Sequence, residues 1–142
     1  MLLVAALALM SKAAAAEPRS PSVSVVVLST RCNRHGFLAL ALQQISEQTL
    51  PIEEVIVVDD GAGRVRDTLQ KQGPLPFNIQ LVEIDARATI GAKRNAAVSA
   101  VKAAGGNAIV LHWEADDLHH PDRVKQQVAP IIAGDASMTA DR

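Results

Sequence analysis

Two clusters of carboxylates are the residues of this sequence best suited to chemistry. They are Asp59 with Asp60, and Glu114 with Asp116 and Asp117. Like charges gathered at one site are unfavourable unless a cation or hydrogen-bond donors compensate them. Mg²⁺ or Mn²⁺ is a natural partner, because such hard cations bind one or two carboxylates together with phosphate oxygens. The alternative is local, since Asp-Asp-Gly is ordinary turn chemistry and Asp117 is able to help start a helix.

A basic motif, Gly91–Asn95, stands where a helix is expected to begin. A helix N-terminus attracts anions, and Lys93 and Arg94 would add two cations beside a diphosphate. The alternative is a solvated pair of surface residues beside a glycine turn. The sequence has neither the GxxxxGK[ST] loop of P-loop enzymes nor a GxGxxG motif after a strand.

Aromatic and imidazole side chains near the second acid cluster give weaker signals. His119 and His120 are adjacent in sequence to the acids and could add a metal ligand, with exposed loop histidines as the alternative. No HExxH pair is present. We expect Trp113 to pack at the end of a strand, with a sugar-stacking platform as the alternative.

Strand and helix patterns alternate four times along the chain. Strands are predicted over residues 23–28, 54–58, 79–84 and 108–111, and helices around 38–45, 65–72, 90–101 and 121–131. The alternation predicts an α/β fold, an open and mostly parallel sheet with helices on both faces and strand 79–84 near an edge. We expect the third helix to bury one apolar face and to be closed by Gly105-Gly106. That face consists of Ile90, Ala97, Val98 and Val101.

The organisation of the chain limits its functional classes. It has 142 residues, 49% of them hydrophobic. The single cysteine excludes a disulfide scaffold, and the net charge of −1 disfavours a nucleic-acid partner. Residues 1–20 are set apart as a leader, because the apolar run Met1–Met10 is too short for a membrane span. Residues 1–16 would fit a secretory signal, and a cytoplasmic location is the alternative. Residues 21–133 form the expected domain, and 134–142 a tail.

Ligands of parallel α/β sheets bind beyond the carboxyl ends of the strands, and the motifs at these ends resemble those of a known family. The chain is similar to the nucleotide-binding half of the family 2 glycosyltransferases, which are inverting enzymes with the GT-A fold. The resemblance rests on VSVVVLSTRCNRHGFL (23–38), VIVVDDG (55–61), IGAKRNAA (90–97) and AIVLHWEADDLHHPDRV (108–124), in the family's order.

The resemblance implies a role for each motif residue. Asp60, or Asp59 beside it, would accept a hydrogen bond from the nucleotide base, and Arg94 would lie near the base or the diphosphate. Glu114 and Asp116 stand where the family's DxD acids bind Mn²⁺ or Mg²⁺, and Asp117 would lie on the ribose side. The loop after the first strand adds further expected nucleotide contacts, Thr30, Arg31 and Asn33.

The family also implies transfer of a sugar from an NDP-sugar to a hydroxyl of a saccharide, lipid or protein acceptor, with inversion. The chain departs from the family pattern in that Glu114 replaces the usual aspartate and Arg31 replaces a nucleotide-contacting hydroxyl. The catalytic base of the family is expected beyond Arg142. The alternative function is therefore a non-catalytic module that binds a nucleotide or nucleotide-sugar.

Overall fold

The computed structural model describes residues 22–29, 35–60, 65–85, 87–101 and 108–140. The strands are β1 (Ser22–Ser29), β2 (Glu54–Asp59), β3 (Asn78–Glu83) and β4 (Ala108–Glu114). The helices are α1 (His35–Ser46), α2 (Val65–Lys71), α3 (Ile90–Ala100) and α4 (Arg123–Ile132). Each predicted strand and helix is therefore present, in the predicted order.

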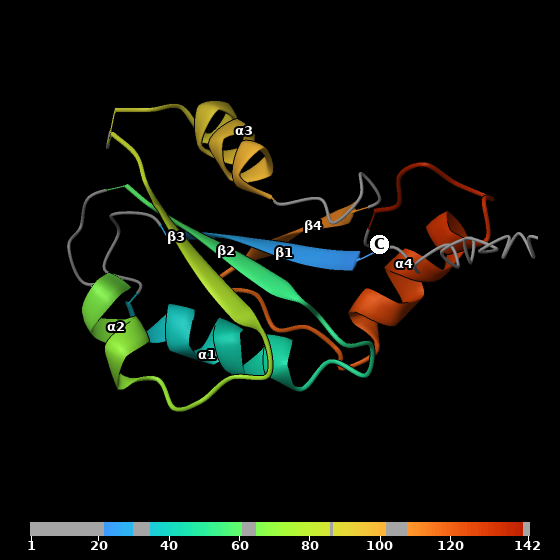
Figure 1. Cartoon of the computed structure of the whole chain (residues 1–142), viewed down its shortest axis with the longest axis horizontal. Coiled ribbons are helices and arrows are strands. Elements are labelled where there is room, and N and C mark those ends of the chain that lie inside the picture. The colour runs from blue at the N-terminus through green and yellow to red at the C-terminus, as the bar shows by residue number, and fades with distance from the viewer. Residues whose placement is uncertain (1–21, 30–34, 61–64, 86, 102–107, 141–142) are drawn as a thin grey trace, which may run out of the picture.

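The strands form one parallel sheet in the order β3-β2-β1-β4. Figure 1 shows α3 on one face of this sheet and α1 and α2 on the opposite face. The first three strands are added in one direction, and α3 then leads back across the sheet so that β4 pairs with the other side of β1. The predicted open parallel sheet with helices on both faces is confirmed, and β3 is an edge strand as expected.

The larger hydrophobic core lies between the sheet and α1. Leu38, Leu42 and Ile45 recur at helical spacing and are all at most 1% exposed. They belong to the same buried cluster as Val25 and Val27 of β1. Each such aliphatic side chain stabilises the fold by about 1.5–3 kcal/mol relative to an exposed position. This packing fixes α1 against the sheet and thereby fixes the end of β1.

The smaller core, under α3, differs from the sequence prediction. Ile90 and Val98 were expected on the buried face of this helix, but they are 59% and 45% exposed. Ala97 is buried as predicted, and Val101 packs partly buried against the same cluster. The prediction was wrong for Ile90 and Val98 and missed Lys93, because an apolar pattern cannot show that a lysine is buried against an acid on another element.

Two predicted features of the termini lie outside the described residues, namely the leader 1–20 and the stop at Gly105-Gly106. Helix α3 ends at Ala100, before those glycines. Helix α4 is followed by Gly134, whose φ of +79° is a conformation that favours glycine. In the described ranges, none of the helices has the length and apolar character needed to cross a membrane.

Candidate functional site

The parallel register brings both acid clusters to one edge of the sheet. Asp59, the last residue of β2, lies beside Ser29, and Glu114, the last residue of β4, lies beside Leu28. The carboxyl ends of β2 and β4 therefore flank the carboxyl end of β1. This is the point where the strand order reverses direction, the usual ligand site of open α/β sheets.

Asp60 and Lys93 form a buried ion pair at this edge. Lys93 Nζ donates to Asp60 Oδ2 at 2.6 Å, and the two side chains are only 8% and 4% exposed. Lys93 is held in place by the start of α3, where the Thr89 hydroxyl accepts a hydrogen bond from the backbone N–H of Ala92 at 3.1 Å. The alternative of a solvated surface residue is therefore wrong for Lys93.

The second oxygen of this aspartate is the most informative atom of the site. Asp60 Oδ1 is buried and has no hydrogen-bond partner among the residues that the structure describes. A buried acceptor without a donor is costly in a native protein. Asp60 Oδ1 is therefore suited to accept a hydrogen bond from an N–H group of a bound molecule, while Lys93 compensates the charge of the carboxylate.

A second ion pair joins the next residue of α3 to the other acid cluster. Arg94 Nη2 donates to Glu114 Oε1 at 2.7 Å, with the side chains 44% and 47% exposed. Neighbouring residues of one helix thus contact the ends of two strands, because Lys93 points inward to β2 and Arg94 toward β4. Exposed pairs of this type contribute only about 0–1 kcal/mol, so a ligand can displace them at little cost.

The remaining acids differ in exposure. Asp59 is 3% exposed, whereas Asp116 and Asp117 are exposed in the turn and loop that follow β4. The backbone N–H of Asp117 donates to the carbonyl of Glu114 at 3.3 Å, which keeps this turn next to the strand end. Thr30, Arg31 and Asn33, the other predicted nucleotide contacts, lie outside the described residues.

The suitability of this edge for a metal rests on two carboxylates. No group of three or more His, Cys, Asp or Glu residues comes together within the described ranges. Glu114 and Asp116 are nevertheless both exposed, with one residue between them in the sequence. Two carboxylates suit Mg²⁺ or Mn²⁺ when phosphate oxygens complete the coordination. These two residues fit a metal that arrives with a diphosphate.

His112, in β4, has a proton affinity that its surroundings lower. Partial burial and the Arg94 guanidinium lower the pKa of His112 below its ordinary value of 6.5, and the Glu114 carboxylate opposes the shift. The imidazole is therefore neutral at neutral pH. The sequence alone did not indicate the lowered pKa of His112, because it does not show that Arg94 lies near the imidazole.

Trp113 packs as predicted and also contacts the segment after the acids. It is 1% exposed, its ring meets that of His119 at 4.4 Å with an angle of 76° between the planes, and the Arg123 guanidinium lies 4.8 Å from its centroid. His119 is thus half-buried against an aromatic ring. The alternative of an exposed loop histidine applies to His120 but not to His119.

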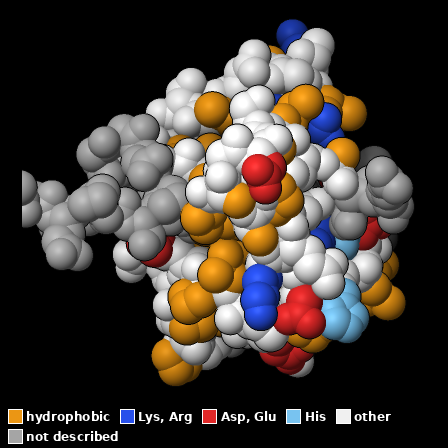
Figure 2. All heavy atoms as spheres, turned by 90° about the vertical axis from the view of Figure 1, so that its right-hand side faces the viewer, with side chains coloured by type: hydrophobic (Ala, Val, Ile, Leu, Met, Phe, Trp, Pro, Cys, Tyr) orange, Lys and Arg blue, Asp and Glu red, His pale blue; other side chains and the backbone are white. Residues whose placement is uncertain are grey.

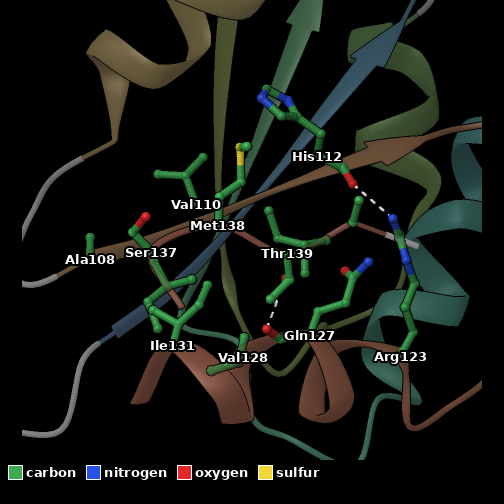
Figure 3. A pocket seen from close by; sticks show the side chains of 13 residues that line it. Ala108, Val110, His112, Arg123, Gln127, Val128, Ile131, Ser137, Met138 and Thr139 are labelled. Atoms are coloured by element: carbon green, nitrogen blue, oxygen red, sulfur yellow. Dashed lines mark hydrogen bonds between the residues drawn. The ribbon is translucent and has the colours of Figure 1, made fainter. Parts of the chain in front are cut away.

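The described residues also form a pocket of about 460 Å³ that is separate from the acid clusters. It lies between β4, α4 and residues 137–140, with Val110, Ile131 and Met138 among its lining side chains (Figure 3). On the face that carries α4, hydrophobic side chains form several patches between isolated charges (Figure 2). None of the predicted site residues lines this pocket, so it is not the candidate site.

Comparison with known proteins gives a matching family and several similar solved structures. The model of "Glycosyl transferase family 2" matches residues 24–142. Crystal structures of S. aureus TarS residues 1–349 in complex with UDP and with UDP-GlcNAc both give a TM-score of 0.59 at 22% identity, over 80% of this chain and 32% and 31% of theirs. A longer S. aureus TarS structure gives 0.55 at 22% identity over 80% of this chain and 20% of that one. The chain thus spans at most a third of the length of these structures, and the likeness shows a shared fold. No curated protein matches the sequence.

Proposed function

Because the chain belongs to glycosyl transferase family 2, we propose that it binds a nucleoside diphosphate sugar and forms the donor half of a glycosyltransferase site. The observation that carries the proposal is that adjacent residues near the start of α3 bind both acid clusters. Lys93 pairs with Asp60, and Arg94 pairs with Glu114. The two pairs bring two carboxylates and two cations to one edge of the sheet, which supports a site for a base and a diphosphate.

Asp60 is proposed to bind the nucleobase. Its Oδ1 atom is the buried acceptor without a partner among the described residues, and the N–H groups on the edge of a base are donors of the right kind. Lys93 compensates the carboxylate charge, so the hydrogen bond to the base forms to an oxygen that is already desolvated. Hydrogen bonds to a charged acceptor are the stronger ones.

Arg94 is proposed to turn from Glu114 to the diphosphate when the donor binds. The exchange is favourable because an exposed ion pair is weak, whereas a guanidinium and a phosphate form two parallel hydrogen bonds. Glu114 would then hold Mn²⁺ or Mg²⁺ together with Asp116. Bound there, the metal would neutralise charge on the diphosphate leaving group.

The reaction proposed for the complete site is inverting transfer of the sugar to an acceptor hydroxyl of a saccharide, lipid or protein. The TarS structures that share this fold were determined with UDP and with UDP-GlcNAc, which supports a uridine nucleotide as the first donor to test. A nucleotide-sugar binding module without transfer is separated from this proposal by a transfer assay.

The test is a thermal melt of the full chain with UDP, GDP, CDP or TDP, each with and without Mn²⁺. A ligand at about 100 times its dissociation constant adds about 2.7 kcal/mol to the free energy of unfolding, which shifts the midpoint visibly. We expect one nucleotide to stabilise the protein, more strongly with Mn²⁺. Asp116→Asn should abolish the metal-dependent part, and Asp60→Asn should weaken binding under both conditions.

Asp135→Asn is the matched control, since it removes the same charge from an exposed position in the segment after α4. It should leave the nucleotide response unchanged. A cooperative melt that no nucleotide shifts would refute the proposed function. An equal loss in Asp135→Asn and Asp116→Asn would show that net charge, and not the site, controls binding.

A further inference from the structure

A glutamine of α1 holds the loop that follows the second acid cluster. Gln44 Oε1 accepts a hydrogen bond from the backbone N–H of His119 at 2.7 Å, and Gln44 Nε2 donates to the carbonyl of Asp117 at 3.4 Å. One side-chain amide therefore satisfies a donor and an acceptor of the loop 117–122. These groups lack secondary-structure partners, because residues 117–120 have no regular structure.

A second glutamine, one helical turn later, repeats this arrangement. Gln48 Nε2 donates to the carbonyl of His120 at 3.1 Å, and Gln48 Oε1 accepts from the backbone N–H of Val124 at 3.0 Å. Gln44 lies in the last turn of α1 and Gln48 two residues after its end, and their amides bind successive points along the loop. The two glutamine side chains thus make hydrogen bonds to backbone groups of the loop that a neighbouring strand would otherwise make.

The end of α1 and the sheet hold the same loop from further directions. The Thr49 hydroxyl donates to Asp122 Oδ1 at 2.7 Å, and the Thr49 backbone N–H donates to the carbonyl of Pro121 at 2.9 Å. From the sheet, Trp113 contacts the His119 ring at 4.4 Å. The loop that begins at the acids is thus held by polar contacts from the last turn of α1 and from the residues that follow it.

We propose that Gln44 and Gln48 are positioning residues that hold Asp116 and Asp117 in the geometry needed for a metal and a diphosphate. The inference rests on the proposed function. A carboxylate on a free loop loses conformational entropy when it binds, whereas one on a loop that is already fixed does not. The glutamines act through the loop backbone and do not contact the donor themselves.

The test compares Gln44→Met, Gln48→Met and the double variant with the full wild-type chain. Methionine is close to glutamine in length and helix propensity, so α1 should remain intact while the hydrogen bonds are lost. Gln43→Met is the matched control, because the Gln43 side chain donates to Glu47 on its own helix, at 3.0 Å. Two readouts are used, amide hydrogen exchange and UDP affinity with and without Mn²⁺.

We expect faster exchange of the His119 amide in Gln44→Met and of the Val124 amide in Gln48→Met, with no change in Gln43→Met. In the double variant, the Kd of UDP with Mn²⁺ should rise about tenfold, because binding must then order the loop that carries the acids. The Kd without Mn²⁺ should rise less, because Asp60 and Arg94 are not held by this loop. Equal losses with and without Mn²⁺, or no loss at all, would overturn the inference.

A failure of the proposed function can be distinguished from a failure of the positioning role. If the wild-type chain itself does not bind UDP, GDP, CDP or TDP, the proposed function fails and the positioning role fails with it. If the wild type binds UDP with Mn²⁺ and the double variant binds it equally well, only the positioning role is wrong.

Discussion

Replacement of Lys93 by methionine should be the most destabilising single change at the candidate site. It removes the partner of Asp60, whose side chain is only 4% exposed, and leaves a nearly buried carboxylate without a compensating cation. Removing one partner of a buried ion pair typically costs about 3–5 kcal/mol. Lys93 itself is 8% exposed, so solvent screening of this pair is slight.

This free energy corresponds to a large change in melting temperature. For a chain of this size, each kcal/mol shifts the midpoint by roughly 3 °C, so Lys93→Met should melt roughly 10–15 °C below the wild type. Urea denaturation gives the free energy directly, provided that the slope with denaturant is unchanged.

The control is an ion pair of similar geometry on the surface. Arg66 and Glu83 approach to 2.8 Å, but their side chains are 63% and 58% exposed. Arg66→Gln should therefore cost less than about 1 kcal/mol. The comparison removes one positive charge in each variant, so the difference reports burial.

The double variant Lys93→Met with Asp60→Leu separates the lost attraction from the stranded charge. Replacing both members of a buried pair by apolar side chains is often neutral or stabilising, so the double variant should recover most of the loss. The reasoning is refuted if Lys93→Met is no less stable than Arg66→Gln, or if the double variant is no more stable than Lys93→Met.

Three further changes test local features of the fold. Gly134→Ala should cost about 1 kcal/mol, because an L side chain is strained at the φ of +79° after α4, and urea denaturation measures the loss. Gly36→Ala should have the opposite sign and stabilise by up to about 1 kcal/mol, since Gly36 lies in α1 and an added Cβ would meet nothing within 4 Å. His112→Asn should make stability less sensitive to acid. With its pKa below 6.5 in the folded protein, His112 is protonated first in the unfolded chain, so wild-type stability is lost as the pH falls below 6.5 and is unaffected above it. Urea midpoints of both proteins between about pH 5 and 7.5 check the sign, and parallel curves would contradict it.

The fold was predictable from the sequence because its information is local. The run Val55–Val58 is apolar on both faces of the strand, and its four residues are at most 1% exposed, as a central parallel strand requires. The rule that parallel strands end at one edge predicted that the two acid clusters would lie at the same edge of the sheet, which the register confirms, whereas the sequence did not predict that Asp59 and Glu114 would flank β1.

The interactions inside the site were not predictable in this way. Lys93 and Arg94 are adjacent and identical in charge, yet one is buried against Asp60 and the other exposed beside Glu114. That difference depends on the angle at which α3 crosses the sheet. Gln44 and Gln48 gave no signal beyond a spacing of four residues, because their partners are backbone groups more than seventy positions away.

The position of β4 has a consequence for the order of folding. The units β1-α1-β2 and β2-α2-β3 join strands that are close in sequence, whereas β4 pairs with β1, with Ser22 beside Ala108. Closing the longer segment costs more chain entropy and is favoured later in folding. Glu114 and the acids after it thus reach Arg94 last. The proposed donor site would then be completed late in folding, so we expect partly folded chains to bind no nucleotide.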